Sequence, residues 1–315
     1  MAIELKKATK QQSKLRLALH GPAGAGKTYT ALRIAKGIGS KIALIDTERG
    51  SASKYADKFE FDVGEVIDDY HPNRLIEALH DIGASGYDVI ICDSLTHFWN
   101  GPGGFLELVD REVKEMLARN RKPDSFAAWK TVTPVYNRLI QAILANPSHV
   151  ICTMRAKMEY SKEQDDRGKT TVRRVGLAPE MRDSFQYEFD VEGMINAEHQ
   201  LVVGKTRCDL VDGKIYDKPG EELGKLLKSW VESGVQAQAM PVTPSPVPIA
   251  KPASLDERIA SARTKLAAIS TKADFDAFTK LMKSPSTPDE IRLALSADWI
   301  AKGSQFESAT GDAAQ

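Results

Sequence analysis

The chain has 315 residues, of which 42% are hydrophobic and 27% are charged, and this mixture is typical of a soluble protein with one large and one small domain. Lysine and arginine number 43, as do aspartate and glutamate, so the formal net charge is zero and a protein coated in basic charge is excluded. Apolar runs are too short to span a bilayer, and residues 1–14 lack the apolar stretch of a secretory signal. We therefore expect a cytoplasmic protein without a membrane partner.

Short strands alternate with helical segments over residues 1–235. In chain order, the predicted elements are a strand at 15–19, a helix at 29–36, a strand at 41–45, a helix at 73–82, a strand at 88–92, a helix at 129–144, and strands at 149–153, 187–195 and 200–205. Strands that are apolar throughout are typically buried on both faces. The pattern predicts an α/β fold with a mainly parallel sheet flanked by helices.

A proline-rich segment, residues 236–253, is predicted to be an extended linker. Residues 254–302 follow it, and their helix-capping and helical-periodicity signals predict a small domain of two or three short helices. Apolar residues recur there on one helical face at Leu255, Ile259, Ala262, Leu266 and Ile269. The polar residues 303–315 are expected to be disordered.

The three cysteines, Cys92, Cys152 and Cys208, lie in or beside apolar runs, and none belongs to a C-x-x-C pair. Cysteine behaves as a small apolar residue in such places. The pattern predicts buried reduced thiols and favours neither a metal site nor a disulfide framework.

A complete phosphate-binding motif, G-x-x-x-x-G-K-[ST], runs from Gly21 to Thr28 between an apolar strand and a helical segment. Its glycines let successive backbone N–H groups point at phosphate oxygens, and the helix N-terminus adds positive charge. Lys27 would neutralise the β- and γ-phosphates of ATP, and the Thr28 hydroxyl would bind Mg²⁺. The predicted nucleotide-binding residues are Gly21, Pro22, Ala23, Gly24, Ala25, Gly26, Lys27, Thr28 and Tyr29.

Two acidic positions at strand ends complete the predicted site. Asp93 ends the strand at 88–92 and would hold Mg²⁺ through water, or else cap a turn. Glu48 follows the strand at 41–45 and is the candidate general base that activates water. Asp46 is its competitor, and we expect Asp46 to support the strand end instead.

The order GPAGAGKT, IDTE and YDVIICDS resembles the core of RecA-like P-loop ATPases, in which a glutamate after the second core strand is the base. The stretches ERGSASKYADKFEFDV and CDSLTHFW resemble more closely the phage-borne Sak-type single-strand-annealing ATPases. The resemblance covers residues 15–230 and implies a RecA-like fold and, if a phage encodes the chain, a location in the host cytoplasm.

The resemblance also implies roles for three cationic residues. Arg155, after the strand at 149–153, would sense the γ-phosphate and lead into a DNA-binding loop. Lys205 and Arg207 would act in trans on the ATP of a neighbouring subunit, so a homo-oligomer is expected; the alternative is a solvated strand end. The chain has almost no domain before the first strand, so both a ring and a filament stay open.

The segment 155–174 carries seven basic and four acidic residues and is predicted to be a flexible loop. It could follow a single-stranded DNA backbone, or it could be a solvated charged hairpin. The candidate DNA-binding residues are Lys157, Arg167, Lys169, Arg173 and Arg174.

These features together predict an ATP-hydrolysing phage recombination protein that acts on single-stranded DNA by annealing or strand exchange, with ATP and Mg²⁺ as cofactors. The C-terminal helices are expected to bind a partner such as a single-strand-binding protein. The alternatives are a P-loop small-molecule kinase, an AAA-type protein-remodelling or loader ATPase, and a nucleotide-gated adaptor that does not turn over.

Overall fold

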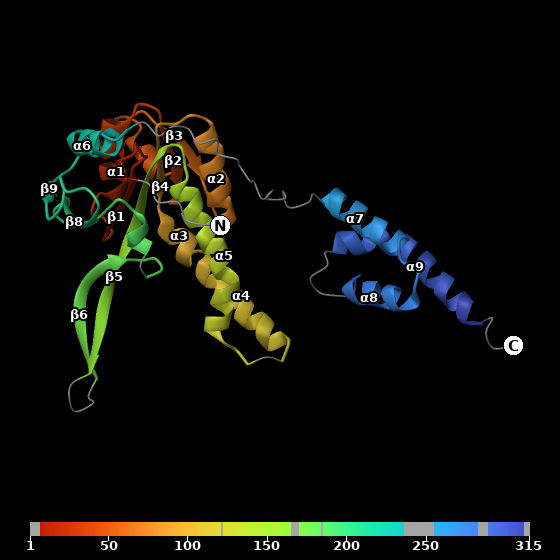
Figure 1. Cartoon of the computed structure of the whole chain (residues 1–315). Helices are drawn as coiled ribbons and strands as arrows, with labels where there is room; N and C mark the ends of the chain where they lie inside the picture. Colours follow the sequence, from red (N-terminus) through yellow and green to blue (C-terminus); the bar gives the residue numbers. More distant parts are fainter. Residues whose placement is uncertain are drawn as a thin grey trace. The chain divides into compact units, whose positions relative to one another are not determined.

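The structure, a computed structural model, describes residues 7–120, 122–164, 170–183, 185–235, 255–282 and 289–311 (Figure 1). The chain forms two compact units, residues 1–238 and 239–315, which divide inside the predicted linker. Within the described ranges, no helix combines the length and the apolar character that crossing a membrane requires.

The described part of the first unit forms one sheet of nine strands. Six neighbouring strands run parallel, in the order β3, β2, β4, β5, β1 and β7, and β8 and β9 continue the sheet in the antiparallel sense. The remaining strand, β6, lies outside this order and pairs with β5. The bounds are β1 Arg16–Gly21, β2 Ile42–Asp46, β3 Asp62–Glu65, β4 Val89–Asp93, β5 His149–Gln164, β6 Thr170–Pro179, β7 Val191–Ile195, β8 Gln200–Thr206 and β9 Ile215–Asp217.

Helices cover both faces of this sheet, as the fully buried strands β1, β2 and β4 require. On one face α1 and α6 pack on Leu17 and Leu19, and on the other α2 to α5 pack on Ala18, Ile90 and Cys152. The helices are α1 Lys27–Ile38, α2 Pro72–Ala84, α3 Leu95–Asn100, α4 Phe105–Ala118, α5 Ser125–Leu144 and α6 Glu221–Glu232, with short 3-10 helices η1 Ala52–Tyr55 and η2 Phe185–Glu188. The predicted α/β class with a mainly parallel, helix-flanked sheet is confirmed.

All three cysteines are free and buried, as predicted. Two of them lie side by side, because Cys92 of β4 is in register with Cys152 of β5. Burial raises the pKa of Cys152, so this thiol stays protonated. The cysteines therefore belong to the core.

Two strand predictions need correction. The strand predicted at 149–153 runs on to Gln164, because its polar half pairs with β6 in an antiparallel hairpin. The strand predicted at 187–195 begins only at Val191. Before it, the 3-10 helix η2 lets the aromatic rings of Phe185 and Phe189 pack together in the core.

The second unit contains α7 Leu255–Ala267, α8 Lys272–Met282 and α9 Asp289–Gly311, which agree with the predicted helical module. Its core is formed by Leu266, Phe278, Met282, Ile291 and Leu295. The disorder predicted from residue 303 on is wrong for residues 303–311, which continue α9. At the start of this stretch α9 packs closely on α8, since a Cβ on Gly303 would lie 3.2 Å from the ring of Phe275. Residues 312–315 lie outside the described residues.

Candidate nucleotide-binding site

The glycine loop connects the carboxyl end of β1 to the first turn of α1. Gly24 and Gly26 have φ angles of +79° and +83°, which favour glycine. A Cβ on Gly21 would collide with the carbonyl oxygen of Ile195, whereas one on Gly24 would meet no atom within 4 Å. The loop therefore closes tightly against β7 at its first residue and stays open at its centre, where a phosphate needs room.

Lys27 closes the loop from its far end. Its ammonium donates to the carbonyl oxygens of Gly21 at 3.1 Å and Pro22 at 2.9 Å. Burial lowers the pKa of Lys27, while the carboxylates of Asp93 and Glu48 favour its charged form. The ammonium lies over the loop, in the position from which it can neutralise a bound phosphate.

Asp93, at the end of β4, is buried and lies between two hydroxyl groups. Thr28 donates to its Oδ2 at 2.5 Å, and Thr153 of β5 donates to its Oδ1. Burial raises the pKa of Asp93, and both hydroxyl bonds oppose that rise. Carboxylate and hydroxyl oxygens are ligands that suit Mg²⁺. The open glycine cradle, Lys27 and this oxygen pair fit Mg²⁺-ATP.

Glu48 lies on the same edge of the sheet as the loop. Asp46, fully buried at the end of β2, accepts from the backbone N–H groups of Glu48 at 2.5 Å and Ala52 at 3.0 Å, and these bonds hold the strand end. The Glu48 side chain extends beyond it, and its Oε1 is 3.0 Å from the guanidinium of Arg155. A carboxylate in this place can accept a proton from a water molecule near the loop.

A buried hydroxyl joins the ends of β2 and β4. Thr47 Oγ1 accepts from the backbone N–H of Ser94 at 2.8 Å and lies 2.6 Å from Nδ1 of His97, and Thr47 N donates to Asp93 O at 2.8 Å. Burial lowers the pKa of His97, as does the positive charge of Arg155. These bonds fix the spacing between Glu48 and Asp93, which come from different strands.

Lys205 and Arg207 lie away from the loop of their own chain. The carboxyl end of β7 is beside Gly21, and β8 runs back from it, so that Lys205 pairs with Glu192 near the start of β7. Lys205 donates to Phe189 O, and Arg207 donates to Tyr187 O at 3.1 Å. In this structure both side chains therefore bind backbone carbonyls near the start of β7.

The basic segment forms a hairpin on the continuation of β5, rather than the predicted flexible loop. Residues 156–164 pair with residues 170–179, because strand pairing satisfies the backbone of this polar stretch (Figure 1). Lys157 is exposed. Arg173 and Arg174 are on β6, their side chains outside the described set, and Arg167 and Lys169 lie outside the described residues.

Two contacts of the site are not predictable from the sequence. Thr153, which binds Asp93, is preceded by an apolar run that predicts only a core strand. His199, in the connection from β7 to β8, lies with its Nδ1 3.0 Å from Ala25 O. No local pattern could have indicated His199, because it lies 174 positions after Ala25 in the sequence.

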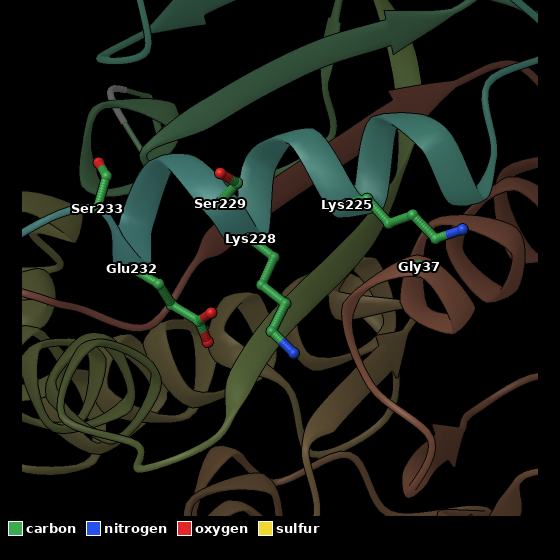
Figure 2. A pocket seen from close by; sticks show the side chains of 6 residues that line it. All are labelled: Gly37, Lys225, Lys228, Ser229, Glu232 and Ser233. Atoms are coloured by element: carbon green, nitrogen blue, oxygen red, sulfur yellow. The ribbon is translucent and has the colours of Figure 1, made fainter.

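A surface hollow on α6 is lined by Gly37, Lys225, Lys228, Ser229, Glu232 and Ser233 (Figure 2). The side chains of Lys225 and Lys228 extend from the helix without converging on one point (Figure 2). The hollow shares no residue with the glycine loop, and we do not include it in the site.

A glycine loop between a buried strand and a helix, with a lysine over its mouth and a strand-end aspartate on its threonine, defines a P-loop ATPase. The sequence model described as "AAA domain" matches residues 13–218, and the chain therefore belongs to this family. No curated protein matches the chain. Among solved structures, an ATPase from the type III secretion system of pathogenic bacteria is similar over 96% of this chain and 82% of that one, with 12% identity and a TM-score of 0.36.

Proposed function

We propose that the chain is a Mg²⁺-dependent ATPase of the Sak-type group that acts on single-stranded DNA in phage recombination, by annealing or strand exchange. The observation that carries the proposal is the 3.0 Å ion pair between Glu48 and Arg155. It joins the candidate base of the nucleotide site to the residue that directly precedes the basic hairpin. One side-chain contact thus links the nucleotide site to the hairpin that we propose binds DNA.

The loop N–H groups and Lys27 would bind the phosphates, and Thr28 with Asp93 would hold Mg²⁺. Bound Mg²⁺-ATP supplies a terminal phosphate with its charge partly neutralised. Glu48 would accept a proton from the attacking water. For ATP hydrolysis, Lys27 must leave its two carbonyl partners and bind phosphate. Glu48 must likewise leave Arg155 and bind the attacking water. Arg155, once released from Glu48, is close enough to the site to sense a terminal phosphate.

Lys205 and Arg207 would complete the site of a neighbouring copy, since they lie away from their own loop. Their carbonyl partners at Tyr187 and Phe189 orient them along the end of β8. Tyr187 is 61% exposed, which leaves this surface accessible to a second chain. The proposed enzyme is therefore a homo-oligomer in which ATP controls assembly.

The hairpin is the proposed DNA-binding element. Residues 156–164 and 170–179 form a two-stranded ribbon that continues the sheet, and its basic residues could neutralise backbone phosphates. Lys157, Arg167, Lys169, Arg173 and Arg174 are the proposed contacts. Lys157 is only two residues from Arg155, so a bound strand would lie close to the Glu48 contact.

For the C-terminal helices we propose partner binding, for example to a single-strand-binding protein. Leu293 and Ile300 of α9 are 80% and 70% exposed. They are seven residues apart and hence on one side of the helix. A small exposed apolar stripe of this kind suits a peptide or helix of a partner.

The decisive measurement is ATP turnover without nucleic acid and with single-stranded DNA, duplex DNA and RNA. We expect single-stranded DNA to give the largest stimulation. A quadruple charge reversal at Arg167, Lys169, Arg173 and Arg174 should weaken single-strand binding and flatten its dependence on salt. The matched control reverses Lys225 and Lys228 on α6. An unchanged salt slope in the hairpin variant would exclude the hairpin.

The family match supports a second candidate, an AAA-type ATPase that remodels or loads a protein. This candidate predicts stimulation by a protein partner and none by DNA. In this chain Asp93 is followed by Ser94 rather than by a second acid, and the candidate base comes from the end of β2. The turnover measurement above separates the two.

A further inference from the structure

The connection between β7 and β8, residues 196–199, lies against the glycine loop at two points. The Ile195 carbonyl, just before the connection, leaves no room for a Cβ on Gly21. At the other end of the loop, a Cβ on Gly26 would lie 3.3 Å from Nδ1 of His199. The loop is thus held from outside by one hairpin.

The polar contact between the two segments is made by His199. Its Nδ1 is 3.0 Å from the carbonyl oxygen of Ala25. A carbonyl oxygen is only an acceptor, so Nδ1 must carry the hydrogen and donate it. The bond therefore fixes both the ring orientation and the position of its proton.

The backbone around His199 is braced in an uncommon conformation. Its φ angle is +64°, in the left-handed region that glycine and asparagine adopt most readily. His199 N donates to Asn196 O at 3.1 Å, and Lys218 N donates to His199 O at 3.2 Å. Asn196 Oδ1 also accepts from Gln200 N at 2.8 Å. These three bonds brace the backbone that carries the imidazole.

We propose that His199 is a positioning residue of the phosphate site, acting on the peptide group between Ala25 and Gly26. In a planar trans peptide the C=O and N–H bonds point in opposite directions. Because His199 draws the Ala25 carbonyl outward, the N–H of Gly26 is turned inward, toward the open centre of the loop. The bond aims one phosphate-binding donor before the ligand arrives.

This inference rests on the nucleotide-binding part of the proposed function and is independent of DNA. It predicts that His199 contributes to phosphate affinity and little to the chemical step. A donor lost from the loop weakens ground state and transition state alike, so KM should rise while kcat changes little. One neutral hydrogen bond corresponds to roughly a 3- to 10-fold change in affinity.

The test compares three variants for binding of Mg²⁺-ADP and for ATP turnover. His199→Gly tolerates the positive φ and removes the donor, so its Kd and KM should rise about 3- to 10-fold. His199→Asn also tolerates the positive φ and places an amide N–H where Nδ1 lies, so it should stay within about twofold of the wild type. In His199→Gln the amide is one bond farther away, and this variant should behave like His199→Gly. Thermal unfolding without ligand checks that each variant is folded.

Equal affinity of the wild type and a folded His199→Gly variant would overturn this inference alone. Failure of His199→Asn to restore affinity would assign the contact to packing and would overturn it too. If the wild type itself does not bind ADP, the proposed function fails as well. Nitrogen NMR of the wild-type imidazole needs no variant: we expect the Nδ1–H tautomer, and the Nε2–H tautomer would contradict the bond.

Discussion

Polar side chains lie at both ends of the strands of the parallel sheet, and Arg16 at the amino end differs from Asp93 and Glu48 at the carboxyl end in the kind of partner that it binds. At the amino edge, Arg16 donates to the carbonyl oxygens of four residues, and His149 accepts from the backbone of Leu15. At the carboxyl edge, Thr28 and Thr153 bind the side chain of Asp93. Glu48 there binds the side chain of Arg155.

The difference separates residues that hold the fold from residues that serve a ligand. The buried guanidinium of Arg16 donates to four carbonyl oxygens at once and can leave them only if the surrounding chain opens, so Arg16 holds the fold. Two side chains that bind each other can rotate and accept another partner. Such pairs mark the carboxyl edge as the functional one, which is also where ligands bind in open α/β sheets.

The largest effect is expected for Lys27→Ala at the carboxyl edge. Without the ammonium the phosphate charge is not neutralised, and binding of Mg²⁺-ATP should become undetectable by calorimetry. The fold should be retained, because only two loop carbonyls lose a donor. Lys225→Ala on α6 is the control. Binding within tenfold of the wild type would contradict the assignment of Lys27.

At the amino edge, Arg16→Met should destabilise the fold by about 4 kcal/mol, because several buried carbonyls lose their donor at once. Urea unfolding measures the loss. Nucleotide affinity of the molecules that remain folded should be unchanged, since Arg16 is at the opposite end of β1 from the loop. If Arg16→Met reduced nucleotide affinity and left the stability of the fold unchanged, Arg16 would belong with the residues that serve the ligand.

Stability should also depend on pH through His149. Burial, with help from the charges of Lys14, Arg16 and Lys228 and against that of Asp88, lowers the pKa of His149 from 6.5 to about 4. The unfolded chain binds this proton first, so stability falls as pH decreases from 6.5 to 4, by about 3 kcal/mol in total. Protonation of Nδ1 would also remove the acceptor of the Leu15 N–H, because the two N–H groups would then face each other.

Urea unfolding of wild type and His149→Asn, measured across this pH range, checks the effect. The asparagine can still accept from Leu15 N but does not titrate. It should flatten the part of the profile that His149 causes. Identical pH profiles for the two proteins would show that His149 titrates alike in the folded and unfolded chain.

For Glu48→Gln we expect nucleotide binding to persist and turnover to fall by at least ~10²-fold, the usual scale for a lost general base. Single-turnover kinetics with Mg²⁺-ATP separate the two quantities. Comparable hydrolysis by the variant would remove Glu48 from the mechanism.

The smallest effect is expected for Thr153→Val, which removes one hydroxyl from Asp93 and keeps the shape of the side chain. The carboxylate loses the bond that fixes Oδ1, so the apparent Mg²⁺ affinity should fall roughly fivefold. Thr153→Ser retains the hydroxyl and should restore the affinity. Equal Mg²⁺ titrations of turnover for the valine and serine variants would exclude this role.

The sequence is sufficient for the central strands and the glycine loop because their signals are local. Continuous apolar runs predict β1, β2 and β4, and the loop motif fixes its own conformation. The edge strand β3 was not predicted, since all four of its residues are exposed and carry no apolar pattern. Helix α4 was also missed; only Phe105, Leu108 and Val109 are buried, near its start.

The missed parts of the site have one physical cause: they depend on contacts between distant segments. Thr153 binds Asp93 across neighbouring strands, and His199 reaches the loop from another hairpin. The polar half of β5 was predicted to be a loop, because its partner β6 cannot be inferred from composition. Charge patterns predict an exposed segment, whereas pairing decides its shape.

Strand β5 carries Thr153 and Arg155 and continues without a break to Gln164, 16 residues in all. From Arg155 to its end it extends about 30 Å beyond the nucleotide site. One continuous strand therefore joins the nucleotide site to the hairpin, so a displacement of the hairpin would act on the segment that carries Arg155. The register shift between Glu159 and Tyr160 adds a bend to this strand.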